Sequence, residues 1–284
     1  MDIYLAFDEL KKEFEAISYQ ERKTREIFKK ILENNSTAIN LTKSTDSDKF
    51  FGSTHFMGFH RADNNEIVRY GKIKLSHEEM GLLLIKQRNR QYQWLLAEAH
   101  EAYEDFIEKI SAIVGSKDAS LWNTKQRKKI NNAPDYSDCI TIIRTNPSEF
   151  SSTKLLNSLR SKFNKINYLE VNNALKCNLR FYLSLIEQLR HHIVHTKGLI
   201  IDTPNFINEV IRKSGLKKND ELESKVRLYL DDSDGNMFVS LSDRPTRSDN
   251  NLEQYHNVIE HLIQMFLSHA LIVFEAIDAS KNEQ

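Results

Sequence analysis

The chain is predicted to fold as a mainly α-helical protein, a bundle of long helices with two small β-hairpins as appendages. Its 284 residues include only eight Gly and four Pro, so few turns interrupt the chain. Apolar residues recur at helical spacing over several long runs, as amphipathic helices require when they pack around a core. The hydrophobic share of 40% and the charged share of 28% are typical of an ordinary globular protein.

The N-terminal part, residues 1–75, is expected to contain helices followed by a hairpin. Apolar spacing over residues 3–33 indicates one or two amphipathic helices. The polar stretch 34–49 is typical of a connection. Residues 54–74 alternate in two short runs around an Asp-Asn-Asn turn, which predicts the first β-hairpin.

The remainder, residues 76–284, is expected to form the helical bundle. The segment Ser76-His77-Glu78-Glu79 is a capping box, in which a hydroxyl and a carboxylate satisfy free backbone N–H groups at a helix start. The helix that it begins should run to Val114 and stop at Gly115. The other core helices are expected at residues 153–166, 172–197 and 250–278.

Shorter elements are expected between the core helices. Residues 139–143 should form a short strand or an irregular segment. Thr203, as N-cap, and Pro204 should open a short helix that Gly215 ends. A second hairpin is predicted around the Asp-rich turn between residues 225 and 241.

The formal net charge is zero, so no overall field attracts a nucleic acid. The charge is unevenly distributed, however, because residues 117–165 hold ten Lys and Arg against four Asp and Glu. The densest part of this stretch contains Lys125, Arg127, Lys128 and Lys129. It could face phosphate groups, or it could be an ordinary solvated loop.

Cysteine use and hydropathy favour a cytoplasmic protein. Cys139 and Cys177 form no paired motif, which is typical of a reducing compartment. Charged residues follow the N-terminus closely, so we expect no secretory signal. The most apolar run, residues 262–277, contains polar and charged side chains and is expected to be a buried helix rather than a membrane span.

The segment Arg190-His191-His192-Ile193-Val194-His195 carries the strongest functional signal. It follows a long apolar-periodic run, residues 172–189. Arginine can hold a phosphate through two parallel hydrogen bonds, and histidine can move protons near pH 7. Together these side chains indicate chemistry on a phosphodiester.

An arginine, then a polar residue, then a histidine after a short spacer, at the end of an apolar helix, resembles the signature of the HEPN superfamily. Arg190, His191 and His195 fit this pattern, and the helix through residues 94–106 resembles the first bundle helix of the superfamily. The resemblance covers about residues 76–278. It implies a HEPN-like helical bundle, and many HEPN proteins are metal-independent ribonucleases of toxin–antitoxin or phage-defence systems.

The resemblance also implies roles for the residues. An endoribonuclease of this type uses the 2′-OH of its own RNA substrate as nucleophile and leaves a 2′,3′-cyclic phosphate and a 5′-OH end. His195 would act as general acid or base, Arg190 would neutralise charge on the phosphoryl group, and His191 would orient the substrate or share the proton transfer. No metal or cofactor is expected. The expected partners are RNA and an antitoxin or other regulatory protein.

Helix geometry adds an expectation about assembly. Residues five apart on a helix point roughly 140° away from each other, so Arg190 and His195 should not converge within one chain. A two-fold pair of chains can present both copies of the motif to one cleft, so we expect a homodimer joined through this helix. Glu187 could pair with Arg190 one turn away. A helix end near Gly198 would raise the pKa of His195.

Other interpretations stay open. Arginine and histidine at a helix end often only complement the helix dipole, and His192 lies outside the motif and could be a plain surface residue. The chain could also be a non-catalytic HEPN-like module that binds a protein or nucleic-acid partner. His191 and His195 have metal-ligand spacing, but no third ligand follows in a recognised pattern. Some HEPN toxins carry a tyrosine two residues after the motif histidine, where this chain has Lys197.

Overall fold

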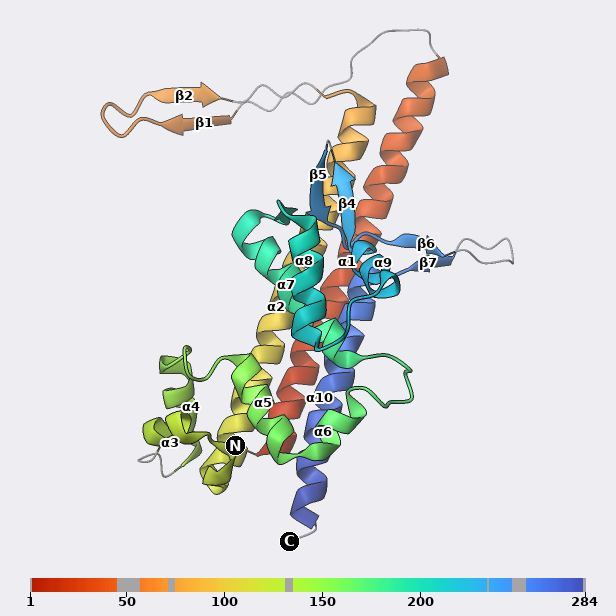
Figure 1. Ribbon diagram of the computed structural model, residues 1–284. Coiled ribbons are helices and arrows are strands. Elements are labelled where there is room, and N and C mark those ends of the chain that lie inside the picture. Colours follow the sequence, from red (N-terminus) through yellow and green to blue (C-terminus); the bar gives the residue numbers. More distant parts are fainter. Residues whose placement is uncertain are drawn as a thin grey trace. The chain divides into compact units, whose positions relative to one another are not determined.

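The computed structural model describes residues 2–44, 57–70, 75–130, 135–233, 235–246 and 254–282. These residues form a mainly α-helical fold, the class that the sequence predicted, with ten α-helices and a few short strands (Figure 1). The α-helices are α1 (Ile3–Ser44), α2 (His77–Lys117), α3 (Thr124–Ile130), α4 (Tyr136–Thr145), α5 (Ser152–Lys162), α6 (Asn164–Leu169), α7 (Leu179–Thr196), α8 (Thr203–Ser214), α9 (Asp220–Arg227) and α10 (Val258–Asn282). The strands are β1 (Met57–His60), β2 (Ile67–Tyr70), β3 (Leu199–Ile200), β4 (Leu230–Ser233), β5 (Asn236–Val239), β6 (Arg244–Thr246) and β7 (Gln254–His256).

The chain divides into two compact units, and each is considered by itself. The smaller unit comprises residues 22–91, and the larger comprises residues 1–21 and 92–284. Helices α1 and α2 contribute residues to both units. The division therefore falls at places other than the expected boundary at residue 76.

In the smaller unit, α1 is longer than predicted. Residues 34–44, expected to belong to a connection, continue the helix, while residues 45–49 lie outside the described part of the chain. Asn35 lies in this additional polar part of α1, and its side chain contacts His77. Its side-chain amide donates to the His77 carbonyl oxygen at 2.8 Å, and its Oδ1 lies 3.2 Å from the His77 ring Nδ1.

The predicted first hairpin is confirmed over residues 57–70. Strands β1 and β2 pair in antiparallel fashion, with His60 opposite Ile67. The outer parts of the predicted hairpin, residues 54–56 and 71–74, lie outside the described residues. The side chains of these two strands are largely exposed.

Helix α2 begins at the predicted capping box but does not end at the predicted glycine. The Glu79 amide donates to Ser76 Oγ at 3.2 Å, and the Ser76 amide donates to the Glu79 carboxylate at 2.7 Å. Gly115 lies inside the helix, which continues to Lys117. A Cβ on Gly115 would come within 1.8 Å of the buried Trp122 ring, whose Nε1 donates to the Gly115 carbonyl oxygen. Gly115 therefore allows the Trp122 ring to pack closely against α2, and it does not end the helix.

The core of the larger unit joins α1, α2, α7 and α10. Phe7 of α1 stacks on Phe274 of α10 with ring centroids 4.9 Å apart, and it also contacts Phe106 of α2. Helix α7 packs against α8 and α10. Along α7, Ile186 is fully buried, and so are Leu185, Leu189 and Ile193, which follow one another at intervals of four residues. Their spacing of four residues places them on one face of the helix, so the opposite face is left for solvent.

Residues 139–143 are helical, so the expected strand or irregular segment is wrong. Asp135 caps α4 by accepting from the Asp138 amide at 3.0 Å. Cys139 and Ile143, four residues apart, are both buried. A short apolar run has the same composition in a strand and in a buried helix, and here the N-cap decides between them.

Two predicted core helices have different limits. The predicted helix 153–166 is two helices, α5 and α6, which meet at Phe163. The predicted helix 172–197 begins only at Leu179, because Asn178 is its N-cap and accepts from the Phe181 amide at 3.1 Å. An asparagine at this position favours a helix start over a helix interior.

The C-terminal third contains the second predicted hairpin in a larger sheet. Strands β4 and β5 pair in antiparallel fashion, and β3 adds to β5 on the other side. The first strand of this hairpin, expected from residue 225, begins only at Leu230, because residues 225–227 belong to α9. The last helix begins at Val258 rather than near residue 250, and strands β6 and β7 precede it. Residues 247–253 lie outside the described part of the chain.

The short helix α8 has the predicted limits with a different N-cap. Asp202, not Thr203, caps it by accepting from the Asn205 amide at 3.0 Å, with Pro204 in the first turn. Gly215 ends the helix with a left-handed φ of 73°, a conformation that glycine adopts without steric cost.

Helix α10 combines high hydropathy with a buried histidine that contacts a carboxylate. Among the described residues, one stretch, Val258–Ser280, is long and apolar enough to cross a membrane by length and composition alone. Half of the most apolar part of this stretch is buried within the protein. His269 in its middle is fully buried and contacts the Glu170 carboxylate at 2.8 Å. These contacts also suit the core helix of a globular protein.

Candidate functional site

The last two turns of α7 place the motif histidines on the exposed face of the helix. His191 and His195 are both exposed, whereas Ile193 between them is buried. Because they are four residues apart, the two rings lie on the same face, with centroids 4.7 Å apart and an interplanar angle of 51°. The structure therefore brings together two imidazoles that face solvent.

Arg190 points to a different neighbour. Its Nη2 lies 3.5 Å from Glu101 Oε1 on α2, and its Nε is buried without a hydrogen-bond partner. The expected pair with Glu187 is not formed, because Lys213 of α8 reaches Glu187 Oε1 at 2.7 Å. Helix geometry places residues five apart roughly 140° from each other around α7, and the Arg190 guanidinium contacts Glu101 of α2, so we still expect one chain by itself not to bring it to the His195 ring.

The surroundings of His191 favour its neutral form. Partial burial lowers the pKa of His191 below its ordinary value of 6.5, and the nearby charges of His195, His192, Lys213 and Arg190 lower it further. An imidazole that is neutral at pH 7 can accept a proton. His191 is therefore suited to act as a base.

His192 is a structural residue rather than a plain surface one. Its Nδ1 lies 3.1 Å from the Leu199 carbonyl oxygen, and its ring meets Phe206 edge-on at 5.3 Å. Its own carbonyl oxygen accepts from the Gly198 amide at 2.8 Å, which closes the end of α7. Lys197 and Gly198 both have positive φ there, and the glycine confirms the predicted stop.

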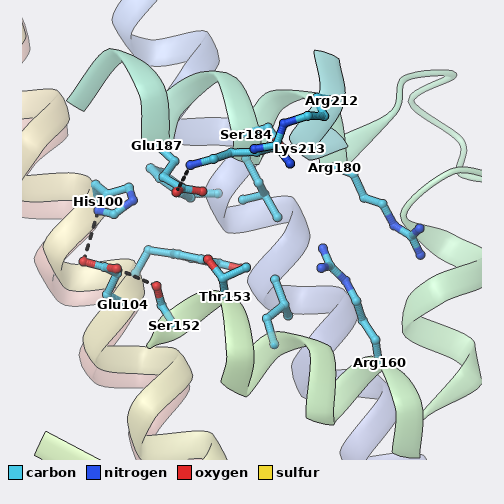
Figure 2. A pocket seen from close by; sticks show the side chains of 14 residues that line it. His100, Glu104, Ser152, Thr153, Arg160, Arg180, Ser184, Glu187, Arg212 and Lys213 are labelled. Atoms are coloured by element: carbon cyan, nitrogen blue, oxygen red, sulfur yellow. Dashed lines mark hydrogen bonds and ion pairs between the residues drawn. The ribbon is translucent and has the colours of Figure 1, made fainter. Parts of the chain in front are cut away.

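A cavity of about 310 Å³ in the larger unit lies beside the exposed face of α7. Figure 2 shows polar side chains on several sides of it. The lining residues are His100, Tyr103, Glu104, Ser152, Thr153, Leu156, Arg160, Arg180, Leu183, Ser184, Glu187, Arg212, Lys213 and Phe266. Glu187 lies one turn before His191, and Lys213 lowers the pKa of His191, so the cavity and the histidine pair are neighbours.

One side of the cavity carries a short chain of polar contacts (Figure 2). His100 Nδ1 lies 3.3 Å from Glu104 Oε2, an ion-pair distance without hydrogen-bond alignment. The Ser152 hydroxyl donates to Glu104 Oε1 at 2.5 Å. Burial opposes ionisation of Glu104, but the contacts with His100 and Ser152 and the charge of Arg190 outweigh it and lower its pKa.

Two arginines of the cavity lining contact a buried carboxylate, Glu170, which also contacts His269. Arg160 and Arg180 each donate to Glu170 at 2.6 Å, and His269 Nε2 donates at 2.8 Å. The Tyr103 hydroxyl donates to His269 Nδ1 at 2.8 Å, an arrangement that requires the proton of a neutral His269 to be on Nε2. Burial lowers the pKa of His269, and it also opposes ionisation of Glu170, but the contacts of Glu170 with His269 and then with Arg160 outweigh its burial and hold its pKa below the ordinary value.

No motif or residue spacing in the sequence predicts this cavity. Its lining residues come from α2, α5, α7, α8 and α10, and no short-range pattern connects them. The basic stretch around residues 125–129 does not contribute to it. In α3, Gln126 and Ile130 are buried, while the lysines and Arg127 lie on an exposed face. Among the residues that the structure describes, no group of three or more His, Cys, Asp or Glu is placed to hold a metal ion.

The chain was compared with known proteins in three ways. No protein-family model matches it. No curated protein and no solved structure matches it either. The function must therefore be inferred from the residues and their geometry.

Proposed function

We propose that the protein is a metal-independent endoribonuclease that uses Arg190, His191 and His195. The observation that carries the proposal is the exposed pair of imidazoles, 4.7 Å apart at the end of α7, beside a cavity rich in cations. The resemblance of the Arg190 to His195 segment to the HEPN signature supports the same chemistry. A role in phage defence or growth arrest would follow from such an activity.

Two histidines side by side suit the proton transfers of RNA cleavage. The neutral His191 accepts the proton of the 2′-OH as its oxygen forms a bond to phosphorus. Protonated His195 gives a proton to the 5′ oxygen as the bond from phosphorus to that oxygen breaks. One proton is taken and one is returned, so the products are a 2′,3′-cyclic phosphate and a 5′-OH end, with no water consumed.

Charge on the phosphoryl oxygens needs a cation at the same place. Arg190 can supply it through its guanidinium, but in one chain this group is turned toward Glu101. We propose that a second copy of the chain, related by a two-fold axis through α7, presents its own Arg190 to the histidine pair. An isologous contact of this kind produces two such composite sites.

The test is cleavage of purified RNA in excess EDTA. The full chain should cut the RNA, and the new ends should be 2′,3′-cyclic phosphate and 5′-OH. The ends can be read by their resistance to ligation and by labelling with polynucleotide kinase. Loss of cleavage in EDTA, or fragments with 3′-OH and 5′-phosphate ends, would contradict the proposal.

A non-catalytic binding module is the second candidate. Ile201 is 84% exposed directly after β3, and Val194 is exposed between the two motif histidines. Exposed aliphatic side chains beside the motif suit a protein contact. This alternative predicts no new RNA ends under any of the conditions above, and it predicts that Ile201→Ser weakens partner capture without changing the fold.

A further inference from the structure

The hairpin of strands β1 and β2 (Figure 1) has one wholly apolar face. Residues that pair across an antiparallel ladder point to the same side of the sheet, and successive residues of a strand alternate between the two sides. The register pairs Met57 with Tyr70 and Phe59 with Val68, so these four side chains share one side, called here the apolar face. The Phe59 and Tyr70 rings lie next to each other on it, with centroids 5.9 Å apart.

The opposite face of the hairpin is mixed. It carries Gly58, His60, Ile67 and Arg69. A Cβ on Gly58 would lie 3.1 Å from the Ile67 side chain, as expected of two residues on the same side. A hairpin with charge on one face and only apolar side chains on the other has the pattern of a sheet that buries one face.

Nothing in the described part of the chain buries the apolar face. Met57 is 50% exposed, Phe59 53% and Tyr70 55%. A two-stranded hairpin by itself is marginally stable in water and needs another element against its apolar side. Contiguous exposed apolar side chains mark an interaction site. We therefore expect a partner to cover this face.

The chemistry of the apolar face selects the kind of partner. A surface that stacks the bases of a nucleic acid combines aromatic rings with cations along the backbone path. The apolar face contains no cation, because Arg69 lies on the opposite face and Arg61 of the turn donates to Asp63 at 2.8 Å. An uncharged apolar face fits another uncharged apolar face. A second copy of the same hairpin supplies one of equal size.

The dimer that the composite RNA site requires also needs more apolar area than α7 offers. On α7, Val194 is exposed to 37%, and the motif side chains around it are polar. A specific dimer commonly buries about 800 Å² on each partner. Phe59 and Tyr70 each still expose roughly 100 Å² that a partner can cover, and Met57 adds to this area. The hairpin is therefore the better candidate for holding two chains together.

We propose that the apolar faces of two hairpins, one from each of two copies of the chain, pack against each other and make the protein a dimer. The contact is isologous, because the same four side chains are contributed by both copies. Chains joined in this way present their α7 helices to each other at a raised effective concentration. The role in cleavage rests on the proposed function, whereas the dimer itself does not.

The test is sedimentation equilibrium of the full chain without RNA, with two serine variants of the same hairpin. Phe59→Ser changes the apolar face, and Ile67→Ser removes a side chain that is 62% exposed on the opposite face. In an isologous contact each substitution acts twice. We therefore expect Phe59→Ser to weaken the dimer at least about tenfold, and Ile67→Ser to change its dissociation constant by less than about threefold.

A conservative variant separates loss of the contact from loss of the hairpin. Phe59→Leu keeps an apolar side chain at the same position and should keep the dimer, while circular dichroism checks that the helices are unchanged in every variant. A dimer that is lost to the same extent in the Leu and Ser variants would contradict packing through the apolar face.

Two further results would overturn the proposal. One is a wild-type chain that stays monomeric in the high micromolar range, and the other is an equal dissociation constant in the Phe59→Ser and Ile67→Ser variants. A monomeric wild-type chain whose Phe59→Ser variant binds RNA more weakly would assign the face to RNA instead. A dimer weakened by Phe59→Ser, in a chain that cuts no RNA, supports the hairpin contact and contradicts the ribonuclease. RNA cleavage with a dimer unaffected by Phe59→Ser does the reverse.

Discussion

Replacement of Glu170 by alanine is expected to lower the free energy of unfolding by about 3–5 kcal/mol, the usual cost of removing one partner from a buried ion pair. Glu170 is fully buried and accepts from Arg160, Arg180 and His269. Without it, two guanidinium groups and one imidazole lose their acceptor inside the protein. Urea denaturation of the variant measures the loss directly.

The matched control is Glu221→Ala. Glu221 also pairs with a cation, Lys225, but at the surface, where solvent screens the pair and it contributes little to stability. If the Glu170 variant lost no more stability than the Glu221 variant, the central role of the buried carboxylate would be wrong. Glu170→Gln, which keeps the shape of the side chain, should lose less stability than Glu170→Ala.

The same group of residues sets the direction of the pH dependence. The pKa of His269 is lowered by burial, so the unfolded chain takes up a proton near pH 6.5 while the folded chain does not. This difference lowers stability as pH falls below 6.5. Glu170 acts in the same direction at lower pH, because its pKa in the folded chain lies below the ordinary 4.5 and its contribution is lost as it becomes protonated. Urea midpoints should therefore fall steadily below pH 6.5.

Loss of either motif histidine should remove most of the RNA cleavage. A positioned general acid or base typically contributes about 10²–10⁴-fold to the rate, so His191→Ala and His195→Ala should each lower the rate by that factor. Val194→Ala, on the same helix between them, changes neither ring and should leave the rate near that of the wild type. Full activity in either histidine variant would remove that residue from the site.

The pH profile separates a proton acceptor from a residue that only shapes the site. Because burial and neighbouring cations lower the pKa of His191, kcat/KM should rise with pH through a midpoint below 6.5. Lys213→Gln removes one of those cations and should move the midpoint upward. If the midpoint did not move in the Lys213 variant, the rise of kcat/KM with pH would not be due to the titration of His191.

Local sequence signals predicted the elements that local contacts define. The capping box at Ser76 begins α2, and Gly215 ends α8 with positive φ. Gly115 was misinterpreted because its role depends on Trp122, which follows after the helix has ended and returns to pack against it. The length of α1 was missed because a polar helix and a polar connection have the same composition.

The candidate site was predictable only in part, because the sequence shows residues of one helix together but not contacts between helices. Arg190, His191 and His195 lie within one helix, so their spacing could be read as a motif. The cavity beside them depends on packing between five helices, and Glu170 is joined to its partners across as many as 99 positions in the chain. No residue pattern of fixed spacing connects such groups, so only the folded structure brings them together.

The central claim is that Arg190 of one chain and His195 of another form one composite site, and mixing inactive variants tests it most directly. Arg190→Ala and His195→Ala are each expected to be inactive. Equal amounts exchanged through partial denaturation should form half mixed dimers, each with one intact site, so RNA cleavage should recover to about a quarter of the wild-type rate. A mixture that forms mixed dimers but stays as inactive as the separate variants would contradict the composite site.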